Sequence, residues 1–226
     1  AQEFEWFNFR ETSENLHDTH FTKPEPLSRG MFGYSLLRAQ ENAEFFNALF
    51  DLLGAFRVPL EGLHTETGPG VYEAAILYDD ILEAADRAVL FKGSVKEIGK
   101  KYGVIPSFMA KWNAQLPGCS GHLHQSLWSD GRNLFHDPND ELGMSSLMGS
   151  YIAGLLHCLP HLLPMYAPTV NSFKRLVEGL WAPTTLTWAI DNRTVCVRAL
   201  PGSEKATRCE LRVVGADVNP YLAMAA

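Results

Sequence analysis

Several features that would place this protein outside the reducing interior of a cell are missing from its sequence. The 226 residues include only four cysteines, and no two of them form a C-x-x-C pair, so neither a zinc knuckle nor a redox motif is present. Isolated cysteines among apolar residues are typical of a reducing cytosol, and we expect a cytoplasmic protein. We find no apolar run near the roughly 20 residues of a membrane span and no signal-peptide pattern, so no membrane partner is expected. The cysteines are Cys119, Cys158, Cys196 and Cys209.

Positive charge is also in short supply. Nineteen lysines and arginines stand against 26 aspartates and glutamates, for a net charge of −7. With no basic run in the chain, a nucleic-acid partner is not expected. The sequence has neither a Walker loop nor a G-x-G-x-x-G fingerprint, so a nucleotide would have to be bound by other means. A local basic pocket is still open, because arginines gather in the C-terminal third.

The pattern of the chain predicts a mixed fold. "EFEWFNF", "GHLHQSLW" and "TRCELRVVG" are typical of strands, and residues 35–53 and 143–163 of helices. Residues 10–33 are predicted as a loop and residues 72–92 as a long amphipathic helix. Strands and helices do not alternate regularly, which favours an α+β fold with an antiparallel sheet over a Rossmann fold. We expect residues 1–226 to form one domain, cut from a longer protein.

Two acidic residues on the first strand suggest a cation site. Glu3 and Glu5 are two positions apart, so both carboxylates face one side of a strand. The aromatic residues Phe4 and Trp6 beside them indicate an interior strand rather than a solvated edge. Two carboxylates in such a place repel each other unless a cation lies between them.

Further acids and basic residues follow along the chain. "EGLHTETGPGVYE" contains Glu61, Glu66 and Glu73, and its Gly-Pro-Gly turn allows the last two to converge. In "RCELR", Glu210 lies between two arginines, which fits either a ligand site or a structural ladder of ion pairs. Carboxylates with one histidine suit Mg²⁺ or Mn²⁺, and arginines beside them suit phosphate.

The stretch "PGCSGHLHQSLW" places His122, His124 and Ser126 on one side of a strand, after a run of small residues. Together with "EFEWF", "EGLHTETGPGVYE", "NSFKRLVEGLWAPTTLTWAIDNRTVCVR" and "RCELRVVGADVNPYLA", it resembles the catalytic domain of the type I glutamine synthetase family. The five stretches occur in the family's order and span almost the whole chain. The resemblance implies a curved, mainly antiparallel sheet flanked by helices. It also implies that the family's N-terminal β-grasp domain and C-terminal tail are absent from these residues.

The resemblance implies a role for each matching residue. Two metal sites, for Mg²⁺ or Mn²⁺, would be formed by Glu5, Glu66 and Glu73 and by Glu3, His122 and Glu210. ATP would be contacted by Glu61, His124, Ser126, Arg198 and Arg208. Glutamate and the transferred phosphate would be held by Gly118, Arg175, Arg193 and Arg212.

The same resemblance implies an ATP-dependent ligase. Such enzymes join glutamate to ammonia or an amine through γ-glutamyl phosphate. They form homo-oligomers, with dodecamers of two hexameric rings and active sites at subunit interfaces. A non-catalytic structural relative is an alternative, although all six metal-ligand positions are filled. A phosphagen-type kinase is another, but the five stretches do not fit it.

One departure from the family pattern concerns the amine. Trp181 in "GLWAPT" stands where glutamine synthetases carry a flap glutamate that helps take a proton from ammonium. An indole cannot act as that base, so we expect an apolar amine pocket larger than ammonia requires, or else a tryptophan that only packs a loop. Leu180, Glu178 and Pro117 also replace usual family residues. Glutamine synthesis and alkylamine ligation both remain open.

Overall fold

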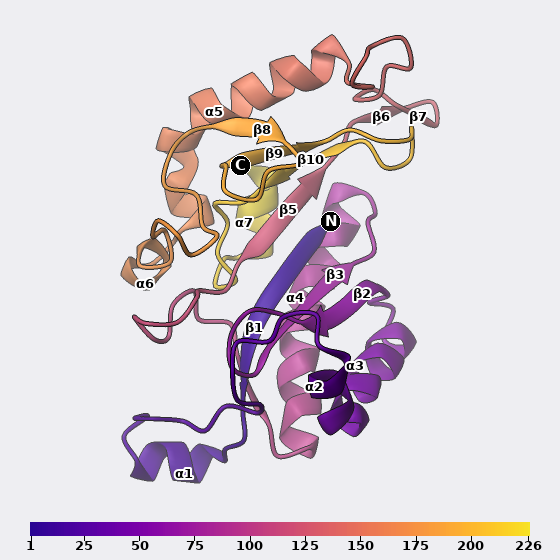
Figure 1. Ribbon diagram of the computed structural model, residues 1–226. Helices are drawn as coiled ribbons and strands as arrows, with labels where there is room; N and C mark the ends of the chain where they lie inside the picture. The colour runs from indigo at the N-terminus through magenta and orange to yellow at the C-terminus, as the bar shows by residue number, and fades with distance from the viewer.

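The computed structural model describes residues 1–226 and builds them around one sheet of eight strands. Seven strands follow the order β2-β3-β1-β5-β10-β9-β8, and β4 pairs with β1 beside this path. All pairs are antiparallel except β8 with β9. The predicted α+β class is therefore confirmed (Figure 1). The strands are β1 (Gln2–Phe9), β2 (Leu60–Thr65), β3 (Val71–Ile76), β4 (Ile105–Ser107), β5 (Gly121–Gln125), β8 (Trp188–Ile190), β9 (Val197–Leu200) and β10 (Arg208–Leu211), with a separate hairpin of β6 (Trp128–Ser129) and β7 (Arg132–Asn133).

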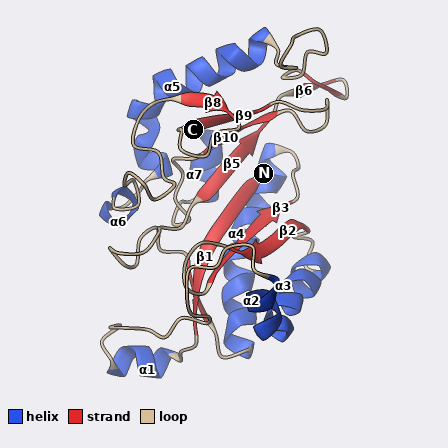
Figure 2. Cartoon of the chain, in the orientation of Figure 1, coloured by secondary structure: helices blue, strands red, loops and turns tan.

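Helices cover the two ends of this sheet. Figure 2 shows the strands as a diagonal band, with α3 and α4 at one end and α5 at the other. The helices are α1 (Ser13–Asp18), α2 (Leu36–Glu41), α3 (Ala43–Ala55), α4 (Ile81–Lys101), α5 (Ser146–Tyr166), α6 (Val170–Phe173) and α7 (Pro220–Ala225).

Two apolar cores hold the helices to the sheet. The larger has 22 buried residues and includes an aromatic group in which Phe4 stacks on Phe91 at 5.6 Å and Trp6 on Phe108 at 5.7 Å. The second core has 15 buried residues, mainly from β5, β9 and β10 and from α5 and α7. Because Phe4 and Trp6 point into the first core, the alternating residues of β1 must point to the opposite face. Glu3 and Glu5 are therefore directed away from the helices.

The prediction of a helix over residues 72–92 is wrong for its first part. Residues 71–76 form β3, which pairs with β1 and β2, and the helix begins only at Ile81. Val71, Tyr72 and Ala74 are almost fully buried. A strand covered on both faces reads as a continuous apolar run, and periodicity over so few residues does not separate it from a buried helix.

Smaller corrections concern the N-terminal half. The loop expected over residues 10–33 contains α1, which begins after Thr12, whose side chain accepts a hydrogen bond from the Asn15 N–H. The helix expected over residues 35–53 is divided into α2 and α3 at Asn42. β4 pairs with β1 alone.

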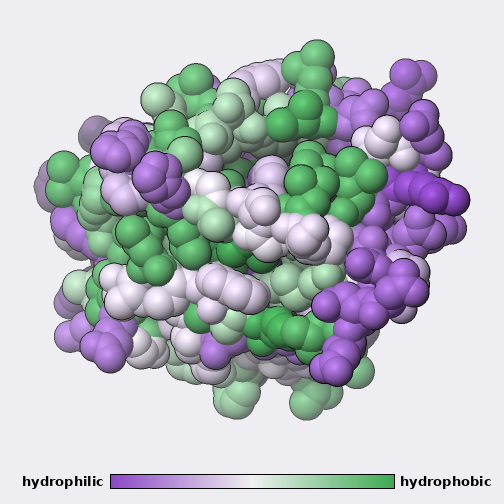
Figure 3. Space-filling model, turned by 90° about the horizontal axis from the view of Figure 1, so that it is seen from above, coloured by the Kyte–Doolittle hydropathy of each residue, from purple (hydrophilic) through white to green (hydrophobic).

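The apolar helix α5 is buried only along one stripe. Met148, Ile152, Leu159 and Tyr166 are its buried residues, and apolar side chains are spread among polar ones on the face seen in Figure 3. By length and composition α5 is long and apolar enough to cross a membrane, which corrects the expectation that no run approaches that length. A single helix of this kind is weak support for a membrane segment, because helices of soluble proteins pass the same test.

Candidate active site

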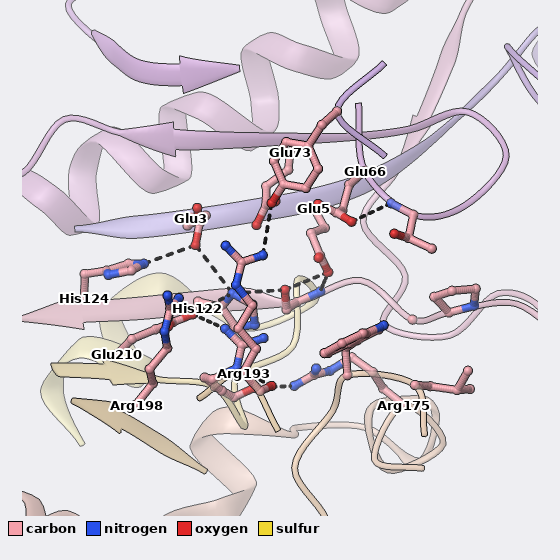
Figure 4. A pocket seen from close by; sticks show the side chains of 18 of the residues that line it. Glu3, Glu5, Glu66, Glu73, His122, His124, Arg175, Arg193, Arg198 and Glu210 are labelled. Carbon is pink, nitrogen blue, oxygen red and sulfur yellow. Dashed lines mark hydrogen bonds and ion pairs between the residues drawn. The ribbon is translucent and has the colours of Figure 1, made fainter. Parts of the chain in front are cut away.

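The register of the sheet brings the acidic residues and histidines together on one face. Glu5 of β1 lies opposite Glu73 of β3, and Glu3 of β1 lies opposite His122 of β5. Residues directly opposite each other on antiparallel strands have neighbouring side chains. Segments separated by more than a hundred residues thus contribute to one row, which Figure 4 shows across the strands.

Pairing extends this row in both directions. On one side His64 of β2 lies opposite Glu73. On the other, Glu210 of β10 lies between His124 of β5 and Arg198 of β9. The acidic residues of β1 and β3 therefore face the arginines of the C-terminal strands and loops across the sheet.

Between these two groups lies a cavity of about 390 Å³. That volume is within the usual range of small-molecule sites. Apart from Pro117, Leu180 and Trp181, its lining is almost entirely polar or charged. The cavity is lined by Glu3, Glu5, Tyr34, Glu66, Thr67, Glu73, Pro117, Gly118, Ser120, His122, His124, Arg175, Leu180, Trp181, Arg193, Arg198, Arg208, Glu210 and Arg212.

Glu3, Glu5, Glu66 and Glu73 form one side of the cavity, the acidic wall. This wall concentrates negative charge in a buried place. Burial raises the pKa of Glu73 well above its ordinary value, and the carboxylates of Glu3, Glu5 and Glu66 raise it further. Glu66 Oε1 accepts a hydrogen bond of 2.6 Å from the Thr67 N–H. These groups repel one another unless a cation or a proton reduces their charge.

Two histidines contact the Glu3 carboxylate. His124 Nε2 lies 3.1 Å and His122 Nδ1 lies 3.5 Å from Glu3 Oε2. Burial alone would raise the pKa of Glu3, but the hydrogen bonds and charges of these two rings hold it well below its ordinary value. Arg208 Nε donates to His124 Nδ1 at 3.1 Å, so His124 Nε2 carries the proton that is donated to Glu3.

Arg175, Arg193, Arg198, Arg208 and Arg212 form the other side of the cavity, the arginine wall. The carboxylate of Glu210 is buried among these arginines. Its Oε2 accepts from Arg198 Nη1 at 3.1 Å, and its Oε1 accepts from Arg212 Nη1 and lies 3.2 Å from His122 Nδ1. Burial opposes its charge, yet His122 and Arg212 hold its pKa below the ordinary value. Of the two arginines that flank Glu210 in the sequence, Arg212 pairs with it and Arg208 turns to His124, while Arg198 supplies the second ion pair.

Arg175 is buried beside the cavity and bound to the backbone. Its Nη2 donates to the carbonyls of Arg212, Val213 and Val214 at 3.0, 2.7 and 3.1 Å. Burial lowers its pKa to about 10. Gly118 lies against its stem, where an added Cβ would be 2.4 Å from Arg175 Cγ and from the Ala110 carbonyl oxygen. Only glycine leaves room for this approach.

The donor set of the acidic wall fits a hard divalent cation. Three groups have ligand atoms within 4.8 Å of one another. Carboxylate oxygens with single imidazole nitrogens suit Mg²⁺ or Mn²⁺, and a cation there would offset the repulsion that raises the pKa of Glu73. The groups are Glu3, Glu73 and His122; Glu3, His124 and Glu210; and His64, Glu66 and Glu73.

Most of the residues predicted from the sequence line this one cavity, but two do not. Glu61 is exposed on β2, and Ser126 lies just past β5, where its Oγ accepts from Trp128 Nε1 at 2.8 Å. Tyr34, His64, Thr67 and Ser120 were not assigned roles from the sequence, although three of them line the cavity and His64 contacts Glu73. His64 stands two residues before Glu66, and that spacing indicates a shared strand face. Tyr34 has no comparable signal.

Trp181 lies at the rim of the cavity and also lines a neighbouring depression. Its side chain is 59% exposed and its φ is +58°, in the left-handed region that disfavours bulky residues. It adjoins Leu180, so the apolar part of the lining is continuous here.

Carboxylates that face arginines across one pocket are typical of proteins that act on phosphate-bearing substrates with a divalent cation. Comparison with known proteins identifies the family. Residues 1–226 match the model described as "Glutamine synthetase, catalytic domain", and the chain belongs to this family.

The relatives include both glutamine synthetases and other amine ligases. The chain is 58% identical to "Type-1 glutamine synthetase 2" from Dictyostelium discoideum, in an alignment that covers the whole chain and 43% of that relative. It is 35% identical to "Glutamate--isopropylamine ligase" from a Pseudomonas species, in an alignment that covers the whole chain and 50% of that relative. It is 36% identical to a "Gamma-glutamylethanolamide synthetase" from Streptomyces coelicolor, in an alignment that covers 99% of the chain and 47% of that relative. The chain thus spans about half the length of these curated relatives.

Proposed function

We propose that the full-length protein is an ATP-dependent carboxylate–amine ligase that makes a γ-glutamyl amide from glutamate. The observation that carries this proposal is the single cavity in which the row from Glu73 to Glu3 faces Arg193, Arg198 and Arg212, in a chain of the glutamine synthetase family. The proposed reaction activates the γ-carboxylate by phosphorylation and then joins it to the amine nitrogen.

The chemistry explains why both walls are needed. A carboxylate oxygen is a poor leaving group, so an amine does not displace it directly. Transfer of the ATP γ-phosphoryl group gives γ-glutamyl phosphate, whose phosphate leaves when the amine nitrogen attacks the carbonyl carbon. The arginine side chains offset the charge of the phosphoryl oxygens and orient them.

Divalent cations belong to this proposal, as Mg²⁺ or Mn²⁺ at two sites. Glu5, Glu66 and Glu73 would hold one, and Glu3, His122 and Glu210 the other. When bound, the cations would neutralise charge on the phosphate oxygens. The burial of Glu73 among other carboxylates supports a cation on that side. Glu210 would have to share its oxygens with Arg198 and Arg212.

The two ends of the cavity suit different substrates. His124, Arg198 and Arg208 would contact ATP, with Glu61 and Ser126 as outer contacts if the bound nucleotide extends past the cavity. Gly118, Arg193 and Arg212 would hold glutamate. Arg175 would act there mainly through its stem and the backbone it binds, because its Nη2 is already engaged by three carbonyls.

The acceptor amine is proposed to be an alkylamine rather than ammonia. Trp181 and Leu180 give the rim an apolar surface where a carboxylate would favour ammonium. Two relatives are named for isopropylamine and for γ-glutamylethanolamide, which supports amines with carbon chains in this family. Ammonia remains the competing acceptor, because another relative is named a glutamine synthetase.

The test is stoichiometric phosphate release by the full-length enzyme. With Mg²⁺ and ATP present, release should depend on both glutamate and an amine, and kcat/KM should be compared for ammonia, ethanolamine, isopropylamine and a diamine. Product mass spectrometry should show the matching γ-glutamyl amide. No release with any amine would favour a non-catalytic relative, and release with ammonia above all alkylamines would favour glutamine synthetase.

Two further points stay proposals. The full-length protein would form a homo-oligomer, a dodecamer of two rings, with each active site completed by a neighbouring subunit. Mass photometry tests the size, and a monomer with full activity would contradict the shared site. A cytoplasmic location is a prediction that fractionation of cells can check.

A further inference from the structure

A short segment before α2 is fixed against the acidic wall. The Tyr34 N–H donates to the Thr65 carbonyl at 2.6 Å, and the Ser35 N–H donates to Thr65 Oγ1 at 2.8 Å. A Cβ on Gly33 would lie 3.3 Å from Glu66 Oε1, tighter than ordinary contact. Residues 33–35 are therefore docked on the end of β2, directly beside a carboxylate that lines the cavity.

Tyr34 adopts a conformation that an aromatic residue rarely takes. Its φ is +54°, in the left-handed region. A non-glycine residue persists there only when surrounding contacts enforce it, and such positions gather at functional sites. The two backbone hydrogen bonds to Thr65 supply that enforcement and direct the Tyr34 side chain into the cavity lining.

The ring of Tyr34 fixes a histidine of the acidic wall. It stacks on His64 with centroids 4.4 Å apart and planes 22° apart. His64 Nδ1 lies 3.1 Å from the Thr65 carbonyl oxygen, and Nε2 lies 3.3 Å from Glu73 Oε2. With one nitrogen at the backbone and one face covered by Tyr34, the imidazole has little freedom to leave Glu73.

The hydroxyl of Tyr34 reaches the opposite wall. It accepts a hydrogen bond of 3.1 Å from Arg193 Nη1. The Arg193 side chain has no other hydrogen bond or ion pair within the chain, so Tyr34 alone holds its guanidinium. Tyr34 thereby contacts His64 at the acidic wall and Arg193 at the arginine wall.

We propose that Tyr34 is a positioning residue that ties the two walls together: its hydroxyl orients Arg193 toward glutamate, and its ring holds His64 against Glu73. This inference rests on the proposed ligase function. The two parts of the side chain have separable roles, because the hydroxyl acts on substrate binding through Arg193 and the ring acts on the Glu73 carboxylate through His64.

Two variants of the full-length enzyme separate these parts. Tyr34→Phe keeps the ring and removes the hydroxyl, so we expect KM for glutamate to rise about 3- to 10-fold, KM for ATP to change less than about twofold and Mn²⁺ affinity to stay as in the wild type. Tyr34→Leu also removes the ring, so Mn²⁺ affinity, measured by electron paramagnetic resonance of free Mn²⁺, should fall about tenfold. Tyr78→Phe is the matched control, because Tyr78 has the same exposure of 57% but lies outside the cavity.

Other results would overturn the inference. An unchanged KM for glutamate in Tyr34→Phe removes the hydroxyl role, and equal Mn²⁺ affinity in Tyr34→Leu and the wild type removes the ring role. A parallel rise of both KM values would indicate a merely structural residue. A wild-type enzyme that binds Mn²⁺ but shows no turnover contradicts the proposed function alone, and the Mn²⁺ series still decides the ring role. A wild-type protein that does not bind Mn²⁺ contradicts both.

Discussion

Ser120 holds Glu5 by two hydrogen bonds to the same oxygen. Its backbone N–H donates to Glu5 Oε2 at 2.6 Å and its hydroxyl donates at 2.7 Å. The Ser120 side chain is almost fully buried. One carboxylate oxygen is therefore fixed by the loop that leads into β5, and the other is left to face the cavity.

Replacing this serine should weaken metal binding without unfolding the protein. In Ser120→Ala the backbone donor remains and the hydroxyl is lost, so Glu5 keeps its place but gains freedom. Loss of a group that orients a metal ligand typically costs 10- to 100-fold in affinity or activity, and we expect the lower end, about tenfold in Mn²⁺ affinity. Ser150→Ala, on the exposed side of α5, is the control. Equal Mn²⁺ affinity in Ser120→Ala and wild type would show that Glu5 needs no such support.

Glu210 should contribute strongly to stability as well as to the site. It is 1% exposed and pairs with Arg198, Arg212 and His122. Glu210→Ala leaves the buried Arg212 without its carboxylate partner, while Arg198 keeps Asp191, and removal of one member of a buried ion pair costs about 3–5 kcal/mol. Urea denaturation of both proteins gives the difference in unfolding free energy. The exposed Glu204→Ala should change it by less than about 0.5 kcal/mol, and a similarly small loss for Glu210→Ala would mean that solvent reaches the arginines.

Sequence patterns predicted which side chains share a strand face better than they predicted the strands and helices themselves. Alternation correctly placed Glu3 and Glu5 on one face of β1, and His122 and His124 on one face of β5, because a strand has a fixed period of two. The same reasoning failed at β3, where Glu73 was placed in a helix, since a strand buried on both faces has no alternation to detect.

Long-range pairing was beyond the sequence. The opposition of Glu3 to His122 and of Glu210 to Arg198 depends on strand order and register, which no local pattern contains. Tyr34 was missed for a related reason: its role arises from a left-handed backbone and from hydrogen bonds to Thr65, thirty-one residues away.

Three of the four cysteines should resist alkylation in the folded protein. Burial raises the pKa of the Cys196 and Cys209 thiols to about 12, and it raises the pKa of Cys119 well above its ordinary value. At pH 8 these thiols remain protonated and inaccessible, so iodoacetamide should label Cys158, which is exposed on α5, before any other. Peptide mass mapping of native protein and of protein in guanidinium gives the order. Native labelling of Cys119 at the rate of Cys158 would contradict this burial.

The same thiols predict how stability depends on pH. Their folded pKa lies above the unfolded value of about 9, so the folded state keeps protons that the unfolded state releases. Their contribution is complete below about pH 9 and is lost as the pH rises toward 12. Unfolding free energy should therefore fall above pH 9, and Cys196→Ala should reduce that slope. A wild-type stability that rises from pH 9 to 10.5 would contradict this sign.

Trp181 should decide the choice between an alkylamine and ammonia. An indole at the rim favours carbon chains by about 0.8 kcal/mol for each CH₂ that is fully buried, and it adds about 0.5–2 kcal/mol for a cationic head over its face. Because Trp181 is 59% exposed, only part of this energy is available. About 1.4 kcal/mol in total corresponds to a tenfold preference.

Trp181→Glu exchanges that apolar surface for a carboxylate. Neither residue is glycine, so both are disfavoured at a φ of +58°, and the substitution mainly changes the chemistry of the rim. We expect the ratio of kcat/KM for isopropylamine to kcat/KM for ammonia to fall about tenfold, because ammonium gains an opposite charge while the alkyl group loses its contact. Trp188→Glu makes the same exchange at a tryptophan that is 46% exposed and outside the cavity, and it should leave the ratio as it is in the wild type. If ammonia is the best substrate of the wild type and Trp181→Glu does not alter the order of amines, the indole does not select the acceptor, and glutamine synthesis becomes the better assignment.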